Sequence, residues 1–155
     1  MKIVIASDHA GFSYKTLLIK DLQQAGYEIL DLGTYGNTPN DDYPDYAEAV
    51  ALSILKKQGE RGILICGSGV GVSVAANKFK EIRAGVCHDT YSAHQCVEHD
   101  NVNVLCIGER IIGIELAREI VFAFIKAVYS RAPRHQRRLD KIEIIENQNM
   151  KEIKL

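Results

Sequence analysis

Five short apolar segments, separated by longer stretches with helical spacing, constrain the fold of this chain more than any other feature. They are mostly apolar at consecutive positions rather than at alternate ones, which is typical of strands buried on both faces of a sheet. Because strands that alternate with helices form βαβ units, the pattern predicts an α/β protein with a five-stranded parallel sheet and helices on both faces. The predicted strands are Lys2–Ala6, Tyr27–Leu32, Gly62–Cys66, Arg83–Cys87 and Asn103–Ile107.

Apolar residues recur at helical intervals between these strands, and two further helices are predicted after the last strand. The segment from Gly33 to Pro44 is rich in Gly, Asn, Asp and Pro, so we expect a loop there. The final helix follows Pro133 and precedes no further strand. We therefore expect an extra C-terminal helix that reaches away from the sheet core, onto a partner subunit. The predicted helices are Ser13–Ala25, Tyr46–Lys57, Gly71–Lys78, Tyr91–Glu98, Ile114–Val128 and Arg134–Gln148.

The chain has 155 residues, of which 46% are hydrophobic and 25% are charged. That balance is ordinary for a globular protein, and the length suits one domain over residues 1–155. The formal net charge of -1 gives no general attraction to nucleic acid or acidic membranes. No apolar run approaches membrane-spanning length, and the run at Met1–Ile5 is too short for a signal peptide. We expect a cytoplasmic protein whose four cysteines are reduced.

Ligands of parallel α/β sheets bind beyond the carboxyl ends of the strands. This rule selects five segments that are far apart in the sequence but that the fold would bring to one edge. They are Ser7–His9, the loop after Leu32, Cys66–Gly71, Cys87–Thr90 and Gly108–Arg110.

Three glycines at alternate positions follow the third predicted strand, in the run Cys66–Gly71 (CGSGVG). Their backbone can approach a ligand closely, and N–H groups at the start of a helix form an anion site. The spacing matches neither the dinucleotide GxGxxG pattern nor a P-loop, so no nucleotide is indicated. A tight turn with a purely structural role is the alternative interpretation.

Cys66 lies directly before this glycine-rich loop. Thiols near helix N-termini ionise more readily than free cysteine, which makes them usable bases or nucleophiles. A buried, inert strand cysteine is the alternative, and we assign Cys87 and Cys106 to that class.

Two further groups could take part in proton transfer or hydroxyl binding. Asp8 and His9 follow the first strand, where a carboxylate and an imidazole could bind or polarise sugar hydroxyls, or could merely cap a helix. His99 lies in a polar segment just before the fifth strand and has the titration range of a general acid, although a lone surface histidine often has no function.

A basic segment begins the last helix. Arg134 and Arg138 are four residues apart, so on a helix they share one face and could bind a phosphate dianion, with Arg110 as a third ligand. The alternative is a solvated basic helix end. An RNA-binding patch is disfavoured because no aromatic residues interleave with these arginines.

A metal site is not predicted, because the five histidines show neither HxxxH nor HExxH spacing and no cysteine pair supports them.

Together these motifs resemble the ribose-5-phosphate isomerase B family, which also includes the galactose-6-phosphate isomerase subunits. The resemblance spans nearly the whole chain, and the CGSGVG run followed by Ala75–Lys78 (AANK) is its most specific part. The other matching segments are Ser7–Gly11, Asp31–Thr34, Asp42–Ala47, Ile82–Ala84 and Arg134–Gln136.

The resemblance implies a Rossmann-like three-layer fold, and a homodimer or dimer of dimers with active sites at the subunit interface. It implies interconversion of ribose 5-phosphate and ribulose 5-phosphate through a cis-enediolate, a pentose phosphate pathway reaction without metal or cofactor. Cys66 matches the base that moves a proton between C2 and C1, His99 matches the acid that helps to open the furanose ring, and Ser68 matches the hydroxyl associated with ring opening. The matched substrate-binding positions are Asp8, His9, Tyr43, Gly67, Ser68, Gly69, Val70, Gly71, Asp100, Arg110, Arg134 and Arg138.

Asp100 departs from the family pattern, which usually has Asn directly after this histidine. An ionised carboxylate only accepts hydrogen bonds, and it would repel a phosphate or an enediolate. Asp100 could turn away, the substrate preference could differ, or Asn101 could replace it. In the family, His99 and the arginines come largely from the neighbouring subunit.

Three alternative functions are open. The first is a six-carbon isomerase acting on allose or galactose 6-phosphate, although the galactose type normally needs two different subunits. This chain carries Cys66, His99 and the arginines together, which favours a self-sufficient homodimer. The second is a regulator that binds a sugar phosphate without catalysis and would need neither Cys66 nor His99. The third is a flavodoxin-like electron carrier.

Overall fold

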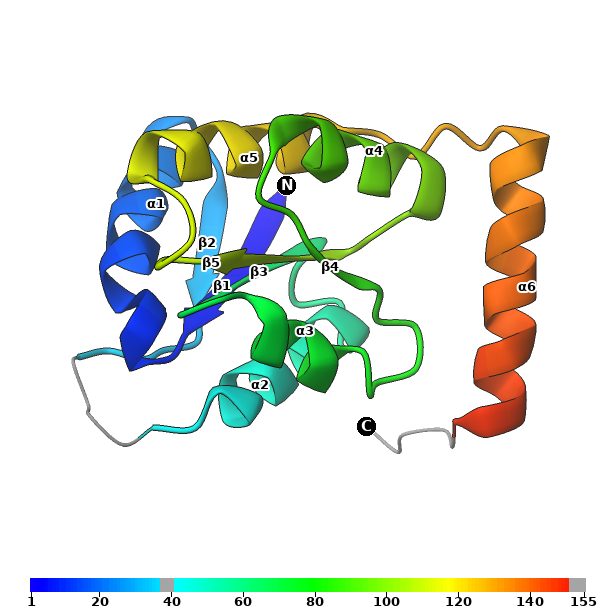
Figure 1. Cartoon of the computed structure of the whole chain (residues 1–155), viewed down its shortest axis with the longest axis horizontal. Coiled ribbons are helices and arrows are strands. Elements are labelled where there is room, and N and C mark those ends of the chain that lie inside the picture. The colour runs from blue at the N-terminus through cyan, green and yellow to red at the C-terminus, as the bar shows by residue number, and fades with distance from the viewer. Residues whose placement is uncertain (37–40, 151–155) are drawn as a thin grey trace.

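A five-stranded, all-parallel sheet forms the centre of the computed structural model, which describes residues 1–36 and 41–150 (Figure 1). The strand order is β2-β1-β3-β5-β4, so the chain moves outward from β1 to β2 and then crosses back to β3. The carboxyl ends of β1 and β3 therefore lie at the topological switch point, where such sheets bind ligands. The strands are β1 Lys2–Ser7, β2 Glu28–Asp31, β3 Arg61–Cys66, β4 Ala84–Val86 and β5 Val104–Gly108.

Alternate residues of the strands pack on opposite faces of the sheet, and each face has its own apolar cluster. Ile3 and Ile5 pack on the side of α1, α4 and α5, whereas Val4 and Ala6 pack on the side of α2 and α3. The predicted three-layer α/β fold is thus confirmed. The helices are η1 His9–Gly11 (a 3-10 turn), α1 Phe12–Gln24, α2 Tyr43–Leu55, α3 Val70–Ala76, α4 Thr90–Asp100, α5 Ile114–Lys126 and α6 Pro133–Asn149.

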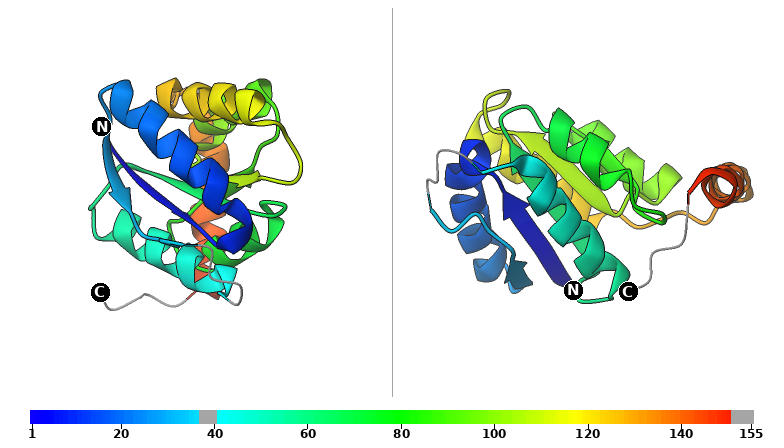
Figure 2. Two further views of the ribbon diagram at one scale, coloured as in Figure 1. Left: turned by 90° about the vertical axis from the view of Figure 1, so that its left-hand side faces the viewer. Right: turned by 90° about the horizontal axis from the view of Figure 1, so that it is seen from below.

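The last helix, α6, stands apart from the sheet and its covering helices, as Figures 1 and 2 show. It follows an irregular connection after α5, and its first turn lies against α4. Of its residues only His135 and Glu146 are buried, while Ile144 and Ile145 are more than half exposed. The expectation that this helix leaves the sheet core is confirmed, and its contact with a partner subunit stays a prediction.

Most helix ends differ from the sequence-based expectation by one to three residues, and two of these differences involve predicted site residues. Within the expected loop Gly33–Pro44, residues 37–40 lie outside the described part of the chain. The last two residues of that expected loop, Tyr43 and Pro44, belong to α2, which begins three residues before the predicted start at Tyr46. Proline is tolerated in a first helical turn because its missing N–H would have no intrahelical acceptor. At the other discrepancy, His99 lies within the last turn of α4 rather than beyond that helix.

Within residues 1–36 and 41–150, no helix is both long enough and apolar enough to cross a membrane.

Candidate active site

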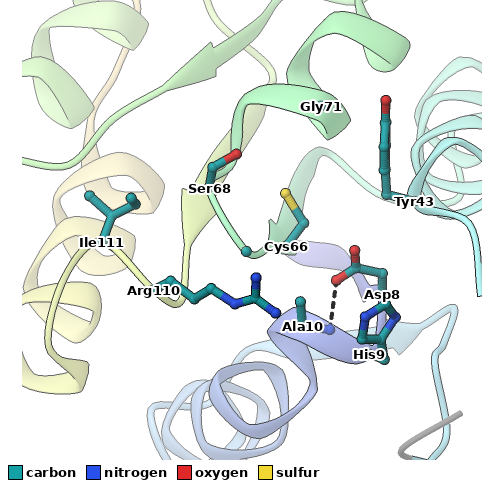
Figure 3. Close-up of a pocket in the computed structure, with 10 residues that line it drawn as sticks. Asp8, His9, Ala10, Tyr43, Cys66, Ser68, Gly71, Arg110 and Ile111 are labelled. Atoms are coloured by element: carbon teal, nitrogen blue, oxygen red, sulfur yellow. Dashed lines mark hydrogen bonds between the residues drawn. The ribbon is translucent and has the colours of Figure 1, made fainter. Parts of the chain in front are cut away.

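A pocket of about 390 Å³ opens at the carboxyl ends of β1, β3 and β5 (Figure 3). These three strands are neighbours in the middle of the sheet, so segments distant in sequence meet there. The start of α2 forms one wall. The lining residues are Asp8, His9, Ala10, Tyr43, Cys66, Gly67, Ser68, Gly71, Arg110 and Ile111.

Cys66 ends β3, and its thiol lies under the glycine-rich loop, only 4% exposed. The backbone N–H of Gly69 donates a hydrogen bond to Cys66 Sγ at 3.1 Å. Gly69 reaches this position with a φ of 78°, and an added β-carbon would lie 3.0 Å from the carbonyl carbon of Ile107. The loop thus directs a backbone donor at the sulfur of Cys66.

Gly71 allows the aromatic ring of Tyr43 to lie against the same loop. A β-carbon on Gly71 would be 2.8 Å from the Tyr43 ring, closer than a real side chain allows. Tyr43 begins α2 and is 40% exposed, so its ring forms a wall of the pocket opposite Arg110 (Figure 3).

Asp8 has the capping role that the sequence left open, and its role in binding sugar hydroxyls stays a prediction. Its carboxylate accepts a hydrogen bond from the backbone N–H of Ala10 at 2.9 Å, which caps η1, and it also lines the pocket. The side chain is nearly buried, and this burial raises the pKa of Asp8 above its usual range, against the lowering effect of the Ala10 hydrogen bond and of His9. A buried carboxyl at this edge is suited to binding hydroxyl groups.

His9 is held from behind by Asp41, a residue that the sequence did not single out. Nδ1 of His9 lies 2.6 Å from Oδ1 of Asp41, and the backbone N–H of His9 donates to the same oxygen at 3.0 Å. The hydroxyl of Tyr46 donates to Oδ2 of Asp41 at 2.9 Å.

Arg110 brings a positive charge to the pocket from the turn after β5. Its backbone N–H donates to the carbonyl of Gly67 at 3.1 Å, and its side chain extends over Gly67 (Figure 3). Ser68 lies on the same rim, where its Oγ accepts a hydrogen bond from Val70 at 3.3 Å. The pocket therefore combines a thiol, a hydroxyl, a guanidinium and backbone donors.

A second cluster of predicted site residues lies where α6 meets α4. The rings of His99 and His135 pack against each other at an angle of 35°, with centroids 4.0 Å apart, and Gln95 contacts Nδ1 of His99 at 2.9 Å. His135 is held by Ser130 at Nδ1 (2.7 Å) and receives a hydrogen bond at Nε2 from Nε of Arg134 (3.0 Å).

The surroundings of His135 disfavour its protonated form. Burial first, and then the electrostatic effects of His99, Arg134 and Arg138, lower the pKa of His135 below its usual value. A neutral imidazole can accept the hydrogen bond from Arg134, whereas the ring contact of His135 with His99 ties the first turn of α6 to α4.

Among residues 1–36 and 41–150, no group of three or more His, Cys, Asp and Glu side chains is arranged to hold a metal ion.

The family model described as Ribose/Galactose Isomerase matches residues 3–142. The chain belongs to this family. The ribose/galactose isomerase relatives include ribose-5-phosphate isomerase B of Escherichia coli, which is 46% identical over 94% of this chain and 96% of its own length. D-erythrulose-4-phosphate isomerase 2 of Mycolicibacterium smegmatis is 46% identical over 78% of this chain and 81% of its own.

The fold agrees with solved structures of the ribose/galactose isomerase family. Ribose-5-phosphate isomerase B of Mycoplasma genitalium with bound ribulose 5-phosphate is 41% identical, with a TM-score of 0.91 over 96% of this chain and 97% of its own. The similarity thus extends over nearly the whole chain.

The pocket of this ribose/galactose isomerase family member brings together most of the predicted site residues. Gly69 and Val70 belong to the same loop without lining the pocket, whereas His99, Asp100, Arg134 and Arg138 lie outside it on α4 and α6. Asn101 follows Asp100 as the left-handed C-cap of α4, with a φ of 49°. The pocket residues brought together are Asp8, His9, Tyr43, Cys66, Gly67, Ser68, Gly71 and Arg110.

Sequence reasoning gave no role to Ala10, Ile111, Asp41 or His135. Ala10 and Ile111 line the pocket beside predicted residues, but neither side chain carries reactive chemistry. His135 lies between the two arginines in a segment that already matched the family, which was a usable signal. Asp41 had none, because its partner His9 is 32 residues away in the sequence.

Proposed function

We propose that this protein interconverts ribose 5-phosphate and ribulose 5-phosphate through a cis-enediolate, with Cys66 as the base. The observation that carries the proposal is the Cys66 thiol, which lies in the pocket and accepts a hydrogen bond from Gly69. Family membership and the relatives named for this reaction support it.

The proposed chemistry follows from the groups in the pocket. The Cys66 thiolate removes the proton from C2 of the open-chain aldose, the C–H electron pair forms the C1–C2 double bond, and the C1 carbonyl oxygen takes up the negative charge of the cis-enediolate. Backbone N–H groups of the loop stabilise the charge on oxygen. The C2 hydroxyl proton then passes to the C1 oxygen, and return of the proton from Cys66 to C1 leaves C2 as the carbonyl of the ketose. Aldose and ketose have the same overall oxidation state, so the step needs no external oxidant or reductant.

The remaining predicted residues would serve this pocket from a second chain. In one chain, His99, Arg134 and Arg138 lie outside the pocket, and α6 extends away from the sheet. In the proposed homodimer or dimer of dimers, α6 lies near a neighbour's glycine-rich loop. His99 then protonates the ring oxygen as the furanose opens, assisted by the Ser68 hydroxyl, and the arginines bind the phosphate.

The first test is turnover of ribose 5-phosphate by the purified protein, compared with Cys66→Ala. We expect Cys66→Ala to lose about 10²–10⁴-fold in kcat, as for a missing acid/base group, and to keep substrate binding. Cys96→Ala is the matched control, because Cys96 lies outside the pocket. Activity of Cys66→Ala within about twofold of the unchanged enzyme would remove Cys66 from the mechanism.

The second test concerns the shared site. Arg134→Ala or Arg138→Ala should raise KM much more than it lowers kcat, because a phosphate remote from the reacting carbons contributes mostly uniform binding. Mixing a Cys66→Ala chain with an Arg134→Ala/Arg138→Ala chain should restore one intact site in each hybrid dimer. Subunit exchange without any return of activity would mean that the arginines serve their own chain.

A second substrate class is favoured by one specific finding. The Mycolicibacterium smegmatis relative, 46% identical, is named for D-erythrulose 4-phosphate, which is one carbon shorter. Comparison of kcat/KM for ribose 5-phosphate, D-erythrulose 4-phosphate and allose 6-phosphate decides chain length. A kcat/KM at least tenfold higher for a four- or six-carbon substrate would refute the five-carbon assignment while leaving the isomerase chemistry in place.

A further inference from the structure

Asp41 lies outside the pocket but holds a residue that lines it. We propose that Asp41 is a positioning residue, which fixes His9 with its proton on Nδ1 and leaves Nε2 to bind a polar atom of the substrate. The inference rests on the proposed function for the nature of the substrate, a sugar phosphate. It goes beyond that function by giving Asp41, which does not line the pocket, a role that acts through His9.

The contacts converge on a single carboxylate. Oδ1 of Asp41 receives the backbone N–H of His9 and also lies 2.6 Å from the His9 ring nitrogen Nδ1. Oδ2 receives the hydroxyl of Tyr46, whose own position is fixed within α2. Both oxygens are thus engaged, so neither the carboxylate nor the His9 ring can rotate without losing a hydrogen bond.

The charge of Asp41 determines which ring nitrogen of His9 carries the proton. Burial alone would raise the pKa of Asp41, but hydrogen bonds from His9 and Tyr46 outweigh it and hold the pKa below its usual value. The carboxylate is therefore ionised at neutral pH and can only accept hydrogen bonds. A contact of 2.6 Å then requires the proton on Nδ1 of His9.

The arrangement points the other end of the ring towards the pocket. The side chain of His9 is 36% exposed, whereas that of Asp41 is 10% exposed, so Asp41 lies behind the imidazole. Asp8 lies beside His9 in the lining, and Arg110 lies across from them (Figure 3). With Nδ1 donating to Asp41, Nε2 is the ring nitrogen left to bind a polar atom of the sugar. Loss of Asp41 would leave the ring free to rotate and to change tautomer.

A kinetic cycle separates positioning from mere support of the fold. Asp41→Ala and Asp41→Asn should each raise KM for ribose 5-phosphate by roughly tenfold, the effect of one charge-assisted hydrogen bond, with a smaller change in kcat. In a His9→Ala background the same changes should have no further effect on KM, because Asp41 acts only through His9. Asp45→Asn is the matched control, since it removes an exposed acid from the first turn of α2 without contact to His9, and it should leave KM unchanged.

The second measurement is ¹⁵N NMR of the histidine rings at a pH above about 8, where imidazoles are neutral. The His9 signals, identified by their loss in His9→Ala, should report a proton on Nδ1, and Asp41→Ala should shift the tautomer towards Nε2. A proton held on Nε2 in the unchanged protein, or a KM penalty that persists in the His9→Ala background, would overturn the proposal. If the unchanged protein isomerises no sugar phosphate, the proposed function fails, and the NMR result alone decides the arrangement of Asp41 and His9.

Discussion

Replacing Gly69 with alanine should damage the stability of the fold and the chemistry of the pocket together. The φ of 78° lies in the left-handed region, which costs an L-residue about 1–2 kcal/mol. The new β-carbon would also lie 3.0 Å from the Ile107 carbonyl carbon and 3.2 Å from the Gly108 nitrogen, and backbone atoms cannot move aside. Overpacking of this kind adds about 1–3 kcal/mol, so the free energy of unfolding should fall by about 2–5 kcal/mol.

The catalytic consequence follows from how that crowding is relieved. The loop must move away from β5, which withdraws the Gly69 N–H from Cys66 Sγ. The same movement displaces the loop N–H groups proposed to bind the enediolate oxygen, and loss of one donor to such a developing charge costs about 10²–10³-fold in kcat. Urea unfolding and saturating kinetics below the unfolding transition measure the two effects separately.

Gly26 provides a matched control for the backbone cost alone. Its φ is 86°, but an added β-carbon would have no heavy atom within 4 Å. Gly26→Ala should therefore lose only about 1–2 kcal/mol of stability, with unchanged kcat. Equal losses of stability in the two variants, or full turnover by Gly69→Ala, would refute the argument that this close approach positions the donor.

Other predictions address ring opening, the buried ion pair and acid stability. His99→Asn should impair turnover of cyclic ribose 5-phosphate more than that of open-chain ribulose 5-phosphate; equal losses, corrected for the equilibrium constant, would contradict its role. Asp31→Asn should lower the free energy of unfolding in urea by about 3 kcal/mol, because Lys15 is only 2% exposed and would lose its carboxylate. Glu28→Gln, at the exposed pair with Lys2, should cost less than about 1 kcal/mol, and similar costs for the two would refute the distinction. The pKa of Asp41 lies below 3.8 in the fold, so its contribution is present above that pH and lost as pH falls through the folded pKa. The stability difference between the unchanged protein and Asp41→Asn should therefore shrink below pH 3.8, and a constant difference would argue against it.

The sheet was predictable because burial on both faces leaves a mark in the sequence. Ile63, Leu64 and Ile65 in β3 are fully buried, and consecutive apolar residues reveal this directly. The prediction was less accurate at the edge of the sheet, where β4 extends only from Ala84 to Val86 and is partly exposed. An edge strand has one neighbour, so side-chain pattern alone defines its ends poorly.

Helix ends were less predictable because capping competes with loop-forming composition. Pro44 indicated a loop that ended there, but it occupies the first turn of α2, so Tyr43 and Pro44 begin a helix instead. At α4, the polar run at His99 suggested a segment beyond the helix. The left-handed Asn101 shows that the helix continues through Asp100, because such a C-cap ends it.

The part of the site at the carboxyl ends of the strands could be predicted, because ligands of parallel α/β sheets bind there. Asp8, Cys66 and Arg110 each lie at or just after the carboxyl end of a central strand, and the parallel arrangement brings their positions together. The hydrogen bond between His9 and Asp41 is a tertiary contact across 32 residues, and no local pattern predicts it.

The position of α6 gives a physical reason for expecting the other half of the site in a second chain. The ring of His135 packs against that of His99 and attaches the first turn of α6 to α4, while the arginines on either side of it remain exposed. Arg138 and Ile145 are seven residues apart, so they lie on one face of the helix, and Ile145 is 59% exposed. A partner subunit that covered Ile145 would bury apolar surface, and the same contact would place Arg138 against that subunit. An exposed apolar residue beside an arginine of the proposed phosphate site is what a shared site requires. If α6 served the pocket of its own chain, it would instead have to fold back towards the end of β3.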